Sequence, residues 1–270
     1  MIKPIRLFNV IAVGLFCCCM ASGQTQPPLN YSRDACVKVR DGKWDEFSAF
    51  LRDVTIKLAK VRVDSGASSS FIVAQAIAPV GRSARCDYHL VTGYDGFPPD
   101  LSEPAKLEAD MQKAGIAMSR QAMAAKRDEL SYLVGVDIWL RHDSVGTSVK
   151  GGYARLNYYK SKPGMVLADW VGMESSGWKA LAESVSKETP GMGWLVATLA
   201  MPGGASLPYN GLTVDSFPNW AALGKGIPAR ATWTKVHADT DMTTYMDRLG
   251  AIVERPRVDI VKFVEIIRAK

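Results

Sequence analysis

The histidines are the first side chains to consider for chemistry, because histidine changes charge near neutral pH. The chain has three, His89, His142 and His237. They are scattered, and no His-x-x-x-His or Cys-x-x-Cys spacing accompanies them, so the sequence predicts no metal site. His142 stands at the expected end of a strand, where we expect it to meet solvent.

His89 is the histidine best placed to act as a general acid or base, since we expect it on the inner face of a strand. Asp137 or Asp95 could orient its ring. The competing interpretation is a buried histidine satisfied by neighbouring hydroxyl groups. We favour this interpretation, because spacing identifies no second catalytic partner.

Other catalytic motifs are missing from the sequence. There is no Gly-x-Ser-x-Gly nucleophile elbow. The segment Pro202-Gly203-Gly204 is typical of a hairpin turn rather than of a loop that cradles phosphate. No motif therefore identifies a reaction.

The elements that must position these side chains occur twice. Residues 36–142 and 157–266 repeat one pattern at an offset of 120 to 123 positions. The matched pairs include Gly42 with Gly164, Pro79 with Pro202, and Asp95-Gly96-Phe97-Pro98 with Asp215-Ser216-Phe217-Pro218. A period of this length has the size of a small domain rather than of a solenoid unit, so it indicates a duplicated domain.

Each copy predicts the element order β-α-β-β-α-β. Strands are expected at 36–40, 71–78, 87–94 and 134–140, and again at 158–162, 194–201, 211–215 and 258–267. Helices are expected at 44–63 and 120–133, and again at 165–187 and 241–253. This order is the ferredoxin-like unit, whose helices cover one face of an antiparallel sheet. The second copy can cover the bare face, so we expect two sheets facing each other in a closed or nearly closed barrel.

The predicted fold class is therefore α+β, with two tandem ferredoxin-like units forming a pseudo-dimeric α/β barrel. The expected divisions are a signal peptide at 1–23, a linker at 24–33, repeat 1 at 34–150 and repeat 2 at 151–270. The doubled order, the Gly42 and Gly164 turns and the paired Asp-x-Phe-Pro segments resemble the dimeric α/β-barrel superfamily. That superfamily includes antibiotic-biosynthesis monooxygenases, and the resemblance is to versions with two fused units. It covers nearly the whole mature chain and leaves function open, because this fold hosts unrelated activities.

The resemblance implies two oxidoreductase alternatives. Fused relatives of the chlorite-dismutase type bind haem through a histidine of the second repeat, where His237 is the only histidine. Its surroundings do not match that family's pattern, so we expect a solvent-facing loop histidine instead. Cofactor-free monooxygenases of this fold hold a polycyclic substrate against Trp, Asn and Tyr side chains. This chain offers Trp and Tyr, without a residue-by-residue match.

Strand alternation predicts which side chains face the barrel interior. Aromatic and neutral polar groups on that face are typical of a cavity that binds a small organic ligand. The predicted lining is Phe71, Gln75, His89, Trp139, Trp194, Thr198 and Tyr209. A barrel interior filled by side chains is equally compatible with the sequence.

The first 23 residues have the pattern of a cleaved export signal. Lys3 and Arg6 precede a largely apolar stretch from Leu7 to Met20, and Gly23 offers a small residue before the new N-terminus. No later stretch is long and apolar enough to span a membrane, so we expect a periplasmic or secreted protein.

The mature chain keeps Cys36 and Cys86. Export permits a disulfide, but the expected strands place the two thiols at opposite ends of the sheet, which favours two unpaired, buried cysteines.

The charge pattern argues against nucleic acid as a partner. The formal charge of +6 falls to +4 without Lys3 and Arg6, and no basic run with interleaved aromatics occurs. Basic residues recur at equivalent strand ends, where they either ring a mouth of the barrel or are simply solvated: Lys38, Arg40, Lys160 and Lys162. The fused repeat removes the usual reason for dimerising, so we expect a monomer or a weak homodimer.

Three functions follow as alternatives. The first is an exported protein that binds a small, partly aromatic molecule between the two sheets. The second is an oxidoreductase, either cofactor-free or haem-dependent, that uses His89 or His237. The third is a structural or interaction module with a filled barrel.

Overall fold

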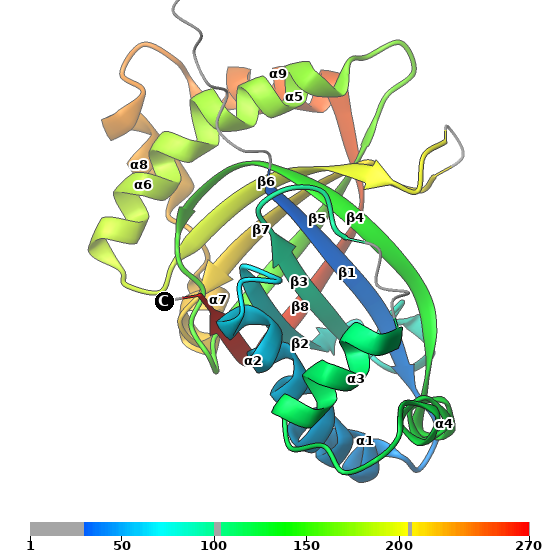
Figure 1. The fold of residues 1–270 in the computed structure, drawn as a ribbon. Helices are drawn as coiled ribbons and strands as arrows, with labels where there is room; N and C mark the ends of the chain where they lie inside the picture. The colour runs from blue at the N-terminus through cyan, green and yellow to red at the C-terminus, as the bar shows by residue number, and fades with distance from the viewer. Residues whose placement is uncertain (1–29, 100–103, 205–206, 270) are drawn as a thin grey trace, which may run out of the picture.

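The fold is a closed barrel of eight antiparallel strands (Figure 1). The computed structural model describes residues 30–99, 104–204 and 207–269. Around the barrel the strands follow the order β1-β3-β2-β8-β5-β7-β6-β4. The first four strands of the chain form one half of the barrel and the last four form the other, as expected for two ferredoxin-like sheets that face each other.

The first half contains four strands and two helical segments. Its strands are β1 (Asn30–Val39), β2 (Ser70–Ala78), β3 (Tyr88–Tyr94) and β4 (Ser131–Gly146). Between β1 and β2 the chain forms one helical run of α1 (Trp44–Phe50), the π-helical turn η1 (Leu51–Thr55) and α2 (Ile56–Asp64). A short 3₁₀ turn, η2 (Gly81–Ser83), precedes β3, and α3 (Pro104–Lys113) and α4 (Arg120–Leu130) precede β4.

The second half repeats this arrangement. Its strands are β5 (Tyr153–Ser161), β6 (Gly193–Met201), β7 (Gly211–Phe217) and β8 (Val253–Arg268). The helical run between β5 and β6 is α5 (Leu167–Met173), the π-helical turn η3 (Glu174–Trp178) and α6 (Lys179–Glu188). The segment before β8 contains α7 (Trp220–Lys225), α8 (Ala229–Val236) and α9 (Met242–Ile252).

Equivalent elements of the two halves stand 122 or 123 positions apart. Both first helical runs contain a π-helical turn, which begins at Leu51 in one copy and at Glu174 in the other. Gly42 and Gly164 both follow the first strand of their copy with positive φ, at 76° and 77°, a conformation that glycine adopts without strain. The predicted α+β duplication is confirmed.

The long last strands of each copy close the barrel. β4 has 16 residues and pairs with β1 of its own sheet and with β6 of the other. β8 also has 16 residues and pairs with β5 and with β2. Closure leaves no unpaired sheet edge, which removes the usual site of strand-to-strand aggregation.

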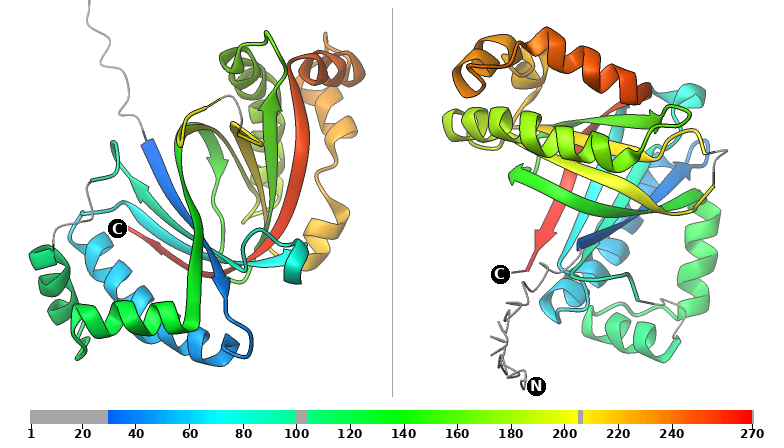
Figure 2. Two further views of the ribbon diagram at one scale, coloured as in Figure 1. Left: turned by 90° about the vertical axis from the view of Figure 1, so that its right-hand side faces the viewer. Right: turned by 90° about the horizontal axis from the view of Figure 1, so that it is seen from above.

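The helices lie outside the barrel in two groups on opposite sides (Figure 2). Each group covers the outer face of one sheet and buries an apolar layer against it. The layer of the first copy includes Phe47, Leu51 and Val73, and the layer of the second includes Trp170, Trp194 and Phe217. The barrel wall is therefore buried on both sides, by helices outside and by other strands inside.

Cys36 and Cys86 form a disulfide, with 5.2 Å between their Cα atoms. The expectation of two unpaired thiols was wrong because β1 begins at Asn30, inside the predicted linker, and not at Cys36. Cys36 thus lies near the C-terminal end of β1, next to the start of β3. The backbone confirms this proximity, since the Asp87 N–H donates to the Val37 carbonyl at 2.8 Å.

The predicted signal peptide lies outside the described residues. Within the described part of the chain, none of the helices has the length and apolar character needed to cross a membrane.

Candidate functional site

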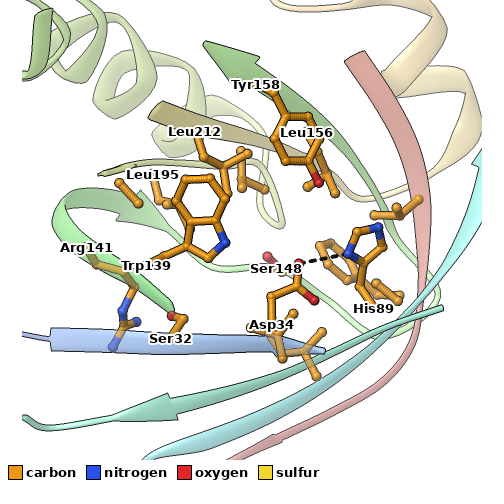
Figure 3. A pocket seen from close by; sticks show the side chains of 17 residues that line it. Ser32, Asp34, His89, Trp139, Arg141, Ser148, Leu156, Tyr158, Leu195 and Leu212 are labelled. Carbon is orange, nitrogen blue, oxygen red and sulfur yellow. Dashed lines mark hydrogen bonds and ion pairs between the residues drawn. The ribbon is translucent and has the colours of Figure 1, made fainter. Parts of the chain in front are cut away.

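A cavity of about 110 Å³ lies inside the barrel, between the two sheets (Figure 3). Most of its wall is aliphatic, including Ile72, Val91, Leu156, Leu195, Leu212 and Val214. A smaller set of polar side chains also faces it: Ser32, Asp34, His89, Trp139, Arg141 and Ser148. An apolar wall with a few polar groups is the usual composition of a small-molecule site.

His89 and Asp34 form a buried pair at one end of the cavity. The distance from His89 Nδ1 to Asp34 Oδ2 is 2.9 Å, and the two residues are 2% and 8% exposed. Burial by itself lowers the pKa of His89, but the Asp34 carboxylate, through its charge and its hydrogen bond, outweighs burial, so the pKa of His89 is raised above 6.5. The Asp34 carboxylate thus favours the protonated, cationic form of the ring.

More charged groups lie near this pair, at one mouth of the barrel. Arg85 donates to Asp137 at 2.9 Å and also contacts the Tyr209 hydroxyl, which donates to Asp137 at 2.7 Å. These three residues line a cleft of about 330 Å³ together with Arg257.

The formal charges of this group cancel. Arg257 pairs with Asp259 at 2.8 Å, as Arg85 pairs with Asp137. With His89 protonated, these two pairs and the His89–Asp34 pair together contain three carboxylates and three cations. Buried charges are tolerated when they are paired and hydrogen-bonded, so this balance accounts for three acids on the inner face of one small barrel.

Three polar side-chain atoms of cavity-lining residues have no hydrogen-bond partner among the described residues. One is Arg141 Nε, a donor, and the other two are Asp34 Oδ1, an acceptor, and Trp139 Nε1, a donor. Both residues line the cavity, and Figure 3 shows the Trp139 indole nitrogen and the Asp34 carboxylate directed toward the same region. A buried donor or acceptor without a partner costs about 1–3 kcal/mol. A donor and an acceptor left open on one cavity are therefore a ready site for a ligand with matching groups.

The structure brings three of the predicted lining residues together. His89 and Trp139 line the cavity. Tyr209 lies at its polar end, with its ring stacked 5.8 Å from the Trp139 ring. Tyr209 precedes β7, so the strand alternation that was used to predict its orientation does not apply to it. The prediction relied on the Asp-x-Phe-Pro match at an offset of 120, whereas β3 and β7 are equivalent at an offset of 123.

The other four predicted lining residues face away from the cavity, so these assignments were wrong. Phe71 and Trp194 belong to the apolar layers under the helices. Gln75 is paired with Tyr88, which packs in the same helix-facing layer. Thr198 accepts or donates a 2.7 Å hydrogen bond with His142 outside the barrel.

This error has a physical cause in the strand pattern. In β2 and β6 one face packs under helices and the other surrounds the cavity, so most side chains on both faces are apolar. Strands of this kind have no polar face to reveal their orientation. The residues that line the cavity from these strands are Ile72, Ala74, Leu195 and Ala197, one position away from the predicted ones.

The partner of His89 was also predicted wrongly. Asp95 is exposed beyond the end of β3, and Asp137 bonds to Arg85 and Tyr209 instead. The true partner, Asp34, was missed because it lies in the polar first half of β1, where the sequence shows no strand-like alternation. Arg85 and Tyr158 were missed as well. Tyr158 lines the cavity, and its ring lies 4.7 Å from that of Tyr209.

His237 lies outside the barrel, at the C-terminal end of α8. Its Nε2 is 2.9 Å from the Gly177 carbonyl oxygen, and its ring packs 4.3 Å from the Trp233 ring. It is partly buried, so the expectation of a solvent-facing loop residue was wrong. These contacts hold the histidine in place and occupy one of its two ring nitrogens. The barrel cavity, at about 110 Å³, is smaller than the roughly 300–1,000 Å³ of typical ligand and cofactor sites. The barrel cavity is therefore too small for a haem.

The basic residues at the strand ends have structural partners. The ammonium groups of Lys38, Lys160 and Lys162 donate to the carbonyls of Gly81, Leu207 and Gly250, and Arg40 donates to the carbonyl of Asp128. They hold neighbouring segments to the strands, which explains why they recur in both copies.

Comparison with known proteins identifies the fold and nothing narrower. No protein-family model matches the chain, and no curated protein matches it. Among solved structures, a proposed monooxygenase from Fusobacterium nucleatum is similar with a TM-score of 0.54 at 9% identity, over 90% of this chain and 96% of that one. A proposed monooxygenase from Lactobacillus acidophilus is similar with a TM-score of 0.52 at 11% identity, over 90% of this chain and 97% of that one. The predicted resemblance is thus confirmed at the level of fold: the chain has the fused, two-unit form of the dimeric α/β barrel.

Proposed function

We propose that the barrel binds one small, mainly apolar molecule that carries a hydroxyl group. The size of the cavity sets the size of the ligand. An engineered protein cavity of about 150 Å³ holds benzene, so a cavity of about 110 Å³ encloses no more than a single ring. Polycyclic substrates are too large for it.

The unpartnered atoms of Asp34 and Trp139 carry this proposal. A hydroxyl group both donates and accepts hydrogen bonds. It can accept from the Trp139 indole N–H and donate to Asp34 Oδ1, which satisfies both buried atoms at once. The aliphatic wall then surrounds the rest of the molecule. A barrel serving only as a filled structural module would not need to leave these two atoms open.

Export is part of the proposal and rests on the sequence of residues 1–23. An exported binding protein would work in the cell envelope or outside the cell, where the Cys36–Cys86 disulfide is stable. N-terminal sequencing of protein recovered from the periplasm or medium tests this point. A start at Gln24 supports export, and recovery of the intact Met1 terminus in the cytoplasm contradicts it.

Calorimetric titration with phenol tests ligand binding, with toluene as the matched control that has a methyl group in place of the hydroxyl. Phenol should bind about tenfold or more tightly than toluene, because each net hydrogen bond contributes about 0.5–1.5 kcal/mol. Trp139→Phe should weaken phenol binding and leave toluene binding unchanged. Trp220→Phe, at an exposed tryptophan, should change neither. Failure of both ligands to bind, or equal affinities for both, would contradict the proposal.

A cofactor-free oxygenase is the second candidate, favoured by the His89–Asp34 pair beside the cavity. Two structures with this fold are proposed monooxygenases. The Asp34 carboxylate raises the pKa of His89, which favours a role as hydrogen-bond donor or acid over a role as base. Oxygen uptake with hydroquinone, measured with an oxygen electrode, tests this candidate. Uptake that is abolished in His89→Gln supports it, and no uptake above the protein-free rate counts against it.

A further inference from the structure

Arg141 lines the cavity without a partner for its charge. Within the described part of the chain it forms no ion pair, and its Nε has no hydrogen-bond partner. The charge of Asp95 acts on Arg141 from nearby, but the two do not form a salt bridge. The other cations around the barrel interior are balanced, since Arg85, Arg257 and His89 each pair with an aspartate. Arg141 is thus a cavity-lining guanidinium without an ion-pair partner among the described residues.

The position of Arg141 relative to Trp139 sets a length. The two residues are two positions apart on β4 and both face the cavity. The Cα atoms of residues two apart on a strand are separated by about 6.6–6.8 Å. This is close to the span of a benzene ring with substituents at opposite ends. Figure 3 shows Arg141 and Ser32 at one side of the Trp139 indole and Asp34 and His89 at the other.

We infer that the ligand is a single-ring aromatic carboxylate with a hydroxyl group opposite the acid, of the 4-hydroxybenzoate type. The carboxylate binds the Arg141 guanidinium, and the hydroxyl lies between Trp139 Nε1 and Asp34 Oδ1. This inference rests on the proposed function, to which it adds the anionic end of the ligand.

The chemistry of each end agrees with this orientation. Guanidinium groups bind carboxylates through two parallel hydrogen bonds. Arg141 is only partly buried, so the charged end of the ligand stays close to water and avoids the cost of full desolvation. The opposite orientation would place a carboxylate against Asp34, where the two negative charges repel each other. The two ends of the cavity are therefore not interchangeable.

Calorimetric titration of the mature chain with 4-hydroxybenzoate, phenol and benzoate tests the inference. We expect 4-hydroxybenzoate to bind at least about tenfold more tightly than phenol, as a charge-assisted hydrogen bond predicts. Its 2- and 3-hydroxy isomers should bind more weakly, because their hydroxyl groups do not reach Trp139 and Asp34 while the acid remains on Arg141.

Variants test which side chain binds each end of the ligand. Arg141→Gln should lower affinity for 4-hydroxybenzoate at least about tenfold and leave phenol unchanged, while Arg141→Lys should retain most of the preference for the acid. Arg52→Gln, at a largely exposed arginine far from the cavity lining, is the control and should have no effect. Two results would overturn this inference and leave the proposed function standing. One is phenol binding with no higher affinity for 4-hydroxybenzoate, and the other is an equal loss of affinity for both compounds in Arg141→Gln. Failure of all three compounds to bind would overturn the proposed function with it.

Discussion

The Nδ1 of His89 lies 2.9 Å from Asp34 Oδ2 in the interior of the barrel, where both side chains are almost fully buried. Asp34 comes from β1 and His89 from β3, and the two strands are paired there in antiparallel register. The pairing of these two strands therefore positions both side chains of the candidate site. One carboxylate oxygen contacts the His89 ring, and the other has no hydrogen-bond partner among the described residues.

Replacing His89 with Gln should destabilise the protein by about 3–5 kcal/mol, because it leaves the Asp34 carboxylate buried without its counter-charge. His142→Gln, at an exposed histidine, should have little effect. Urea unfolding followed by circular dichroism measures both. Equal stability of the His89 variant and the native chain at pH 6 would show that the pair contributes nothing.

The contribution of His89 should also depend on pH in one direction. Its folded-state pKa is raised above 6.5, so the stabilisation is complete below about pH 6.5 and is lost as pH rises through the folded-state value. The stability difference between the native chain and His89→Gln should therefore shrink between pH 6 and pH 9. A difference that grows over this range would be inconsistent with a charged His89.

Glu174 should make the protein less stable in alkaline solution. It is 0% exposed and both carboxyl oxygens lack partners among the described residues. Burial, followed by repulsion from Asp215, raises the pKa of Glu174 well above its usual value of 4.5. The folded state thus retains a proton that the unfolded state loses, and stability falls by up to about 1.4 kcal/mol per pH unit between the two pKa values.

Glu174→Gln replaces the protonated carboxyl with a neutral group of the same shape and should remove this slope. The variant should match the native chain near pH 4.5 and exceed it in stability at pH 8. Unfolding free energies measured across this range decide the matter. Parallel pH profiles for the two proteins would mean that Glu174 is ionised in the folded state.

The Cys36–Cys86 disulfide should contribute about 4 kcal/mol, because it closes a loop with a sequence separation of 50. The double variant Cys36→Ala/Cys86→Ala should show this loss in urea unfolding. Alkylation of the unfolded mature chain provides the direct check. We expect no labelled thiols without reductant and two with it, and two labelled thiols without reductant would contradict the structure.

Gly211 should not tolerate a larger side chain. A Cβ at this position would lie 2.7 Å from the ring of Trp170, which is fully buried under the helices. Gly211→Ala should therefore cost about 1–3 kcal/mol. Gly172→Ala is the matched control, since it lies in α5 with open space around it and should stabilise the helix by up to about 1 kcal/mol. Similar effects from the two substitutions would argue against the packing of Trp170 on β7.

The architecture could be predicted because the sequence contains two copies of the same structural unit. A mistake in one copy is checked by the other, and glycine turns such as Gly42 and Gly164 mark equivalent positions. The inner faces of β3 and β4 were also assigned as the structure has them, through His89 and Trp139. In β3 and β4, charged residues on the cavity side made the alternation visible.

The site itself was only partly predictable, because its key contact joins residues that the sequence separates by 55 positions. Asp34 lies in a stretch without a strand signal, so neither its strand nor its direction could be assigned. The orientation of β2 depended on choosing between Phe71 and Ile72, two apolar neighbours that periodicity cannot distinguish. The unpaired state of Arg141 depends on where every nearby acid lies and can be seen only in the folded chain.

The most direct measurement is the indole N–H resonance of Trp139 in a two-dimensional NMR titration with phenol, assigned by its loss in Trp139→Phe. Trp139 Nε1 has no hydrogen-bond partner among the described residues, so a hydroxyl that binds there should move this resonance with saturation. The exposed Trp44 and Trp220 indoles serve as internal controls and should stay in place. A Trp139 resonance that does not move at saturating phenol, or that moves no more than the two control resonances, would contradict the assignment of the barrel cavity as a ligand site.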